Sequence, residues 1–144
     1  MQNLDIITLC KKISNEDIKV NIRTQDIAYN YKKNKNQKRE QTLIFILTDK
    51  MEELIKDNNI INFFVDVTYK IIPKRHRKYK LLTITGVNKN NLNSYLCGLV
   101  LIQYETHETF YRVFKYLHDM FDFNPIIVNI DYSKLLRSSL LTDN

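Results

Sequence analysis

The chain has 144 residues, 44% of them hydrophobic and 11% aromatic, so it is long enough to bury the core of one globular domain with a short accessory segment. Only two glycines and two prolines occur, which excludes a collagen-like chain and a Gly/Pro-rich linker. The formal net charge is +6, and no signal peptide or apolar run of ~20 residues occurs, so we expect a soluble intracellular protein.

Residues 1–59 form the expected accessory segment, which the sequence predicts to be mostly helical. One amphipathic helix is predicted after Thr24, and an apolar run follows at 42–47. The segment "TDKMEELIKDN" predicts a short helix, because Thr48 can act as its N-cap. The residues expected to face inward are Ile27, Ala28 and Tyr31 on the first helix and Met51, Leu54 and Ile55 on the second.

Three strands are predicted from residue 60 onward, because β-branched and aromatic residues recur between turn signals. The first strand ends at Pro73, which cannot donate a hydrogen bond to a neighbouring strand. Short connections favour antiparallel pairing of all three strands. Their predicted ranges are 60–72, 79–87 and 94–104.

A helix is predicted over 106–121, because apolar residues recur at helical spacing and Thr106 can cap it. The fourth strand, 125–131, is apolar until it ends on Asp131, and "YSKLLRSSLL" then predicts another helix. A strand, a crossover helix and a further strand make the fourth strand parallel to its neighbour. We therefore expect an α/β fold with helices on the sheet faces.

Asp66 interrupts the apolar strand at 60–72, where a buried carboxylate is poorly tolerated without a partner. If the fourth strand lies beside the first, Asp131 can approach Asp66, and a cation between the two carboxylates would offset their repulsion. Mg²⁺ suits that role because it binds carboxylate oxygens. The alternative is that Asp66 faces solvent at a sheet edge and that Asp131 caps the following helix.

Basic residues cluster in a part of the chain without acids, since no Asp or Glu occurs from Val67 to Tyr104. A second basic cluster lies at 32–39. Such patches attract polyanions; the alternatives are solvated loops, or a nuclear-localisation role for "PKRHRKYK". The residues that we assign to nucleic-acid binding are Lys74, Arg75, Arg77, Lys78 and Lys80.

The histidines and cysteines show no spacing typical of a metal site or a catalytic nucleophile. His107 and His118 are predicted to lie on a helix surface, whereas His76 lies in the basic loop and could contact phosphate. Cys10 and Cys97 are predicted to be buried thiols. No P-loop occurs, so no small-molecule cofactor is expected.

Four segments, "FFVDVTYKIIP", "YKLLTI", "YETHETFYRVFKYL" and "PIIVNIDYSKLL", together resemble the Mutator-like (MULE) transposase domain. The resemblance covers about residues 60–141 and lies in the order and spacing of these motifs. It implies an RNase H-like fold, with 60–144 as the N-terminal half of the domain. By this likeness Asp66 and Asp131 are the first two catalytic acids, which hold Mg²⁺ or Mn²⁺ for DNA cleavage and strand transfer.

The chain departs from the family pattern at Lys80, where Gln is usual, and at Ser133, where an acid often follows. The family's third acid lies downstream near a Cys/His segment, and the chain ends at Asn144 before either. We therefore expect a fragment or truncated remnant of a DNA transposase, nuclear and inactive as this chain, with DNA as its partner. The alternative is a non-catalytic module that binds DNA or another protein.

Overall fold

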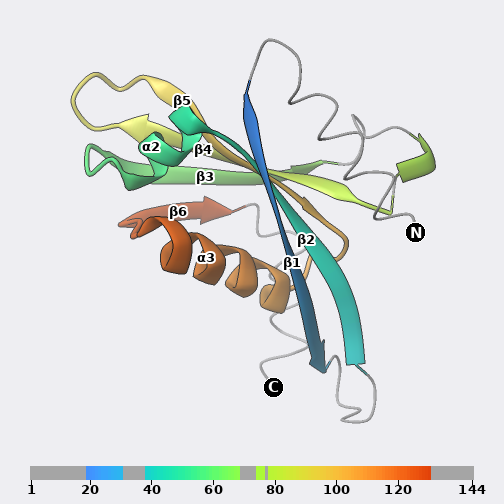
Figure 1. Ribbon diagram of the computed structural model, residues 1–144. Helices are drawn as coiled ribbons and strands as arrows, with labels where there is room; N and C mark the ends of the chain where they lie inside the picture. Colours follow the sequence, from blue (N-terminus) through green and yellow to red (C-terminus); the bar gives the residue numbers. More distant parts are fainter. Residues whose placement is uncertain (1–18, 31–37, 69–73, 77, 131–144) are drawn as a thin grey trace.

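A mixed sheet of six strands, in the order β1-β2-β5-β4-β3-β6, is the framework of the described part of the chain (Figure 1). The computed structural model describes residues 19–30, 38–68, 74–76 and 78–130. Neighbouring strands are antiparallel apart from β3 and β6, which run parallel. The elements are β1 (Val20–Asn30), β2 (Lys38–Thr48), α2 (Asp49–Lys56), β3 (Ile60–Thr68), the 3₁₀ turn η1 (Lys74–His76), β4 (Lys80–Asn88), β5 (Ser94–Ile102), α3 (His107–Phe121) and β6 (Ile127–Ile130).

The part of the sheet that follows residue 60 agrees with the sequence prediction. β3, β4 and β5 form an antiparallel meander. The chain then passes through α3, and β6 lies parallel beside β3 with Ile130 opposite Val65. The predicted α/β class and the predicted parallel strand are therefore confirmed. β3 ends at Thr68, and residues 69–73 lie outside the described part.

The N-terminal segment differs from the prediction. Residues 20–30 form β1, which pairs with β2 along its whole length, so the helix predicted after Thr24 is wrong. Ile27 is buried and Ala28 is exposed, as the alternation of a strand requires. Because β2 also pairs with β5, the described residues before 60 belong to the same sheet and are not mostly helical. Predicted features outside the described residues are those at Cys10, at Tyr31 and in the helix after Asp131.

Both described helices begin at the residues that the sequence predicted as caps. Thr48 Oγ1 accepts a hydrogen bond from Met51 N at 3.1 Å, and Thr106 Oγ1 accepts one from Thr109 N at 3.2 Å. Asp122 ends α3 in the left-handed conformation, with φ of 54°. The buried apolar residues are Leu54 and Ile55 on α2 and Phe110, Val113, Leu117 and Phe121 on α3, while His107 and His118 are exposed, as predicted.

The main core lies between the sheet and these two helices, and β3 supplies Phe63 and Val65 to it. The ring of Phe63 meets the ring of Phe123 edge-on, with centroids 4.9 Å apart. Cys97 of β5 is a buried free thiol, as predicted, and burial raises its pKa to about 11. The core therefore joins residues from both halves of the described chain.

The opposite side of the sheet is only partly covered. A smaller cluster of Ile44, Tyr79 and Leu101 covers one region of it. Next to that region, the surface that β3, β4, β5 and β6 present away from α3 is called here the open face, and its residues include Asn62, Phe64, Asp66, Thr83, Thr85, Leu96, Ile127 and Asn129. Phe64, Leu96 and Ile127 are 46%, 43% and 47% exposed there.

Gly86 of β4 is the more closely packed of the two glycines, and we expect Gly86→Ala to destabilise the chain. A Cβ at this position would overlap Ile60 Cγ2 and would lie 3.0 Å from Cys97 Sγ and 3.1 Å from Phe63 Cε1. Overpacking of this kind lowers the free energy of unfolding by about 1–3 kcal/mol, which urea denaturation measures.

Gly98→Ala on the neighbouring strand is the matched control. There the added Cβ would lie 3.4 Å from Leu47 Cδ2, an ordinary van der Waals distance. We expect its free energy of unfolding to be unchanged or to rise by about 0.4–1 kcal/mol, because alanine restricts the unfolded chain more than glycine does. Equal losses in the two variants would contradict the packing that we describe around Gly86.

Candidate metal and nucleic-acid site

Asp66 lies on β3 with its side chain on the open face, exposed to solvent. Its Oδ1 accepts a hydrogen bond from Val67 N at 3.0 Å, and its backbone oxygen accepts one from Thr83 Oγ1 at 3.5 Å. The expectation that the strand buries this carboxylate is therefore wrong. Phe63 and Val65 are the residues that enter the core, and strand alternation turns Asp66 to the other side.

The predicted second acid, Asp131, lies outside the described residues. The residue before it, Ile130, pairs with Val65, the residue before Asp66. The sequence argument required the fourth strand to lie beside the first, and this condition is met by β6 and β3. The approach of the two carboxylates remains a prediction.

Asn129 of β6 forms side-chain hydrogen bonds to β3. Its Nδ2 donates to Asn62 Oδ1 at 2.6 Å and to the backbone oxygen of Phe63 at 3.2 Å. These side-chain bonds supplement the backbone pairing of a strand that is only four residues long. They hold β6 in one register against β3, and that register determines which residues share the open face.

The chemistry of Asp66 suits one ligand position of a Mg²⁺ or Mn²⁺ site. Its carboxylate is a hard oxygen donor, and its exposure leaves room for the water molecules that complete the coordination of such ions. In the described ranges, no three His, Cys, Asp or Glu side chains gather as a metal-binding group. The second ligand that the sequence predicts, Asp131, lies outside the described part.

The basic residues predicted to bind nucleic acid follow β3 in the chain, at the end of the sheet toward which Asp66 lies. Lys74 and Lys78 are exposed, and Lys78 Nζ lies 5.2 Å from the centre of the Tyr79 ring. Lys80 differs, because its Nζ lies 3.3 Å from Glu105 Oε1 and the two side chains are 29% and 17% exposed. The side chain of Arg75 and the whole of Arg77 lie outside the described residues.

Two residues of this connection, His76 and Tyr79, are buried. Tyr79 is fully buried, and burial, followed by the negative charge of Asp26, raises its pKa to about 12. Its backbone N–H donates to the backbone oxygen of His76 at 2.9 Å. His76 is only 4% exposed, so the expectation that its ring contacts phosphate is wrong in this conformation.

A polar network that the sequence analysis missed lies where β2 separates from β5. Gln41 Nε2 donates to Thr109 Oγ1 at 2.7 Å, and Gln41 Oε1 accepts from Gln103 N at 3.1 Å. Gln103 Oε1 in turn accepts from Thr42 N at 3.1 Å. The signal in the sequence was a glutamine beside an apolar strand run at both positions 41 and 103.

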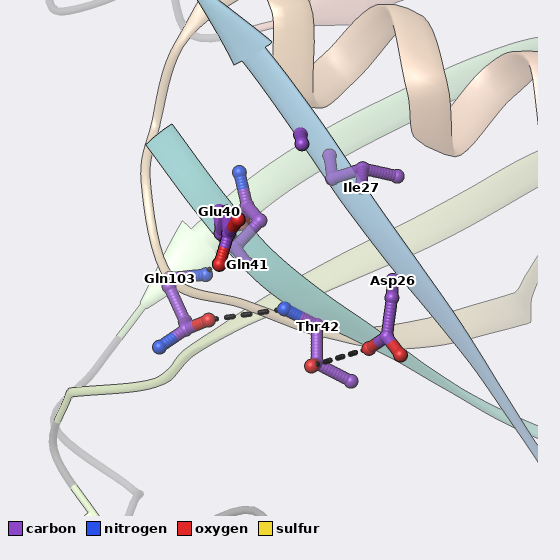
Figure 2. A pocket seen from close by; sticks show the side chains of 7 residues that line it. Asp26, Ile27, Glu40, Gln41, Thr42 and Gln103 are labelled. Carbon is purple, nitrogen blue, oxygen red and sulfur yellow. Dashed lines mark hydrogen bonds between the residues drawn. The ribbon is translucent and has the colours of Figure 1, made fainter. Parts of the chain in front are cut away.

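This network borders a cavity of about 500 Å³ whose lining includes Asp26, Glu40 and Thr42 (Figure 2). Figure 2 shows Thr42 between Asp26 and Gln103, and Thr42 Oγ1 donates to Asp26 Oδ1 at 2.7 Å. The hydrogen bonds around the cavity connect β1, β2, and the residues between β5 and α3. We therefore interpret the network as a structural link between the N-terminal hairpin and the rest of the sheet.

Comparison of the chain with protein-family models, with curated proteins and with solved structures found no match. The resemblance to the Mutator-like transposase domain therefore rests on the quoted motifs alone. Within the described ranges, no helix is long and apolar enough to cross a membrane.

We expect Gln41→Leu to lower the free energy of unfolding by about 1–3 kcal/mol, because buried partners of its amide lose their hydrogen bonds. These partners are Thr109 Oγ1 and the backbone N–H of Gln103. Gln25→Leu is the matched control, since Gln25 is an exposed residue of β1. Urea denaturation measures both variants, and equal stability of the two would contradict the structural role of Gln41.

Proposed function

We propose that the chain is part of a DNA transposase of the Mutator-like family and that residues 60–144 belong to an RNase H-like domain. The observation that carries this proposal is the position of β6, parallel to β3 and next to it. An antiparallel meander, a crossover helix and a parallel strand beside the first strand form the layout that the resemblance implies. Fold alone does not establish function, so the proposal also depends on the site residues.

Asp66 and Asp131 are the proposed metal ligands. The register of β3 and β6 supports this role, because Val65 and Ile130, the residues before the two acids, are paired neighbours. When bound, Mg²⁺ or Mn²⁺ would activate a water or a 3′-hydroxyl and stabilise the leaving oxygen at a phosphodiester. The part of this chain would be to hold the ion at the Asp66 carboxylate and to position DNA next to it.

The proposed DNA contacts come from the connection between β3 and β4. Lys74 and Lys78 expose their side chains there, and Arg75 and Arg77 lie in the same short segment. Lys80 contributes less than the sequence suggested, because Glu105 offsets its charge. The connection follows the strand that carries Asp66, so a backbone held by these cations would run close to the proposed metal site.

A second candidate function is DNA binding without catalysis. The exposed lysines favour it, since binding of a phosphate backbone needs neither a metal nor Asp131. In this second candidate function, the chain binds DNA through these lysines and Asp66 has no catalytic role.

Asp66→Asn should weaken Mn²⁺ binding by about tenfold or more, because the change removes one of two proposed carboxylate ligands. The amount of free Mn²⁺ measured by electron paramagnetic resonance during a titration reports this affinity directly. Asp119→Asn is the matched control, because Asp119 is an exposed carboxylate on α3 that pairs with Lys115. If both variants bind Mn²⁺ as the unchanged chain does, Asp66 holds no metal.

The salt dependence of duplex DNA binding tests the basic connection. Four phosphate contacts, from Lys74, Arg75, Arg77 and Lys78, predict a slope of log affinity against log salt of roughly −3.6. The double variant Arg75→Ala, Arg77→Ala should reduce the magnitude of this slope by about 1.8 and weaken all duplex sequences alike.

The matched control for the double variant is Lys50→Ala, Lys115→Ala, which removes the same charge from the exposed surfaces of α2 and α3. Lys80→Ala is informative in addition, because its ion pair with Glu105 predicts a smaller change in slope than a free cation would cause. An unchanged slope in the arginine variant would exclude Arg75 and Arg77 from DNA binding.

A further inference from the structure

Phe64 is an exposed aromatic residue in the interior of the sheet, between β4 and β6. Its side chain is 46% exposed, although β3 has a hydrogen-bonded neighbour on each side. Thr85 lies opposite it on β4 and Asn129 lies opposite it on β6, so its nearest neighbours on the open face are small polar side chains. These neighbours leave the aromatic ring accessible, and the exposed side chains of Leu96 and Ile127 lie on the same face.

Phe64 and Asp66 lie on the same side of the same strand. The rise of a strand places their Cα atoms about 7 Å apart. Beyond Asp66, β3 ends at Thr68, and the connection with the exposed side chains of Lys74 and Lys78 follows. An aromatic ring, a carboxylate and cationic groups therefore follow one another along the direction of β3.

We propose that Phe64 is a stacking platform for an unpaired nucleotide and that the open face along β3 binds a single-stranded segment of nucleic acid. The inference rests on the proposed function, because it places a phosphate of that strand at Asp66 and its metal ion. A ring on a sheet surface cannot insert between the paired bases of a duplex, but it can stack on a base that has left the duplex. The exposed cations at the end of β3 complement the charge of the backbone that carries such a base.

A single tryptophan at position 64 tests this directly, because the natural chain contains no tryptophan. In Phe64→Trp, the addition of an oligothymidylate should quench the fluorescence, since a stacked base lies against the indole ring. Tyr111→Trp is the matched control: Tyr111 is an aromatic residue of α3 with a similar exposed fraction, 54%. Its fluorescence should stay unchanged when the oligonucleotide is added.

Three results of this experiment would overturn the inference. Equal quenching in Phe64→Trp and Tyr111→Trp would show that the oligonucleotide contacts the protein surface without preference for the open face. Absence of quenching in Phe64→Trp while duplex DNA still binds would exclude stacking and leave the proposed function intact. A blue-shifted emission of Phe64→Trp before any oligonucleotide is added, with protection from acrylamide, would show that protein covers this part of the open face.

Affinity measurements give an independent test. Phe64→Ala should bind oligothymidylate about 5- to 150-fold more weakly, which is the range for the loss of one base–aromatic stack. Phe64→Tyr keeps the aromatic ring and should retain the affinity of the unchanged chain. Duplex affinity should be the same in all three proteins. If Phe64→Ala binds oligothymidylate as tightly as the unchanged chain does, Phe64 has no stacking role. If the unchanged chain binds neither oligothymidylate nor duplex DNA, the proposed function is overturned as well.

Discussion

The pairing of β3 with two different neighbours is the constraint on which the rest of the structure depends. β3 is antiparallel to β4, which follows it in the sequence. It is parallel to β6, and a short connection cannot join two parallel neighbours. The chain must therefore return along the sheet between β5 and β6, and α3 performs that return. α3 buries Val113 and Leu117 over one side of β3, so Phe63 and Val65 enter the core and Asp66 lies on the other side.

The N-terminal hairpin is part of this structure and does not form a separate unit. β2 and β5 pair over a short stretch, from Ile44 opposite Leu101 to Ile46 opposite Leu99. Beyond that stretch, side chains replace the backbone as hydrogen-bonding partners, and Gln41 carries the connection. A buried amide is costly unless its groups are satisfied, and here the amide oxygen and nitrogen both have partners.

Local patterns were sufficient to predict the strands and the helix between Ile60 and Ile130, because α3 has a strong helical period and the meander has short turns. The sequence pattern did not indicate β1, because the strand conformation of this segment depends on its pairing with β2. The exposure of Asp66 was misjudged for a related reason: a run of apolar residues does not reveal which face is covered. The ion pair of Lys80 with Glu105 joins residues that are distant in sequence, and no local motif indicates it.

The hydrogen bond between Asn129 and Asn62 has a consequence for the order of folding. These residues are 67 positions apart in the sequence, whereas the meander is built from neighbouring strands. Closing so long a loop is entropically costlier than forming a hairpin, so the contact between β3 and β6 is expected to form after the meander. The surface on which Asp66 and Phe64 lie would then be complete only in the last stage of folding. A chain that had not reached that stage would have most of its sheet but would lack the proposed site.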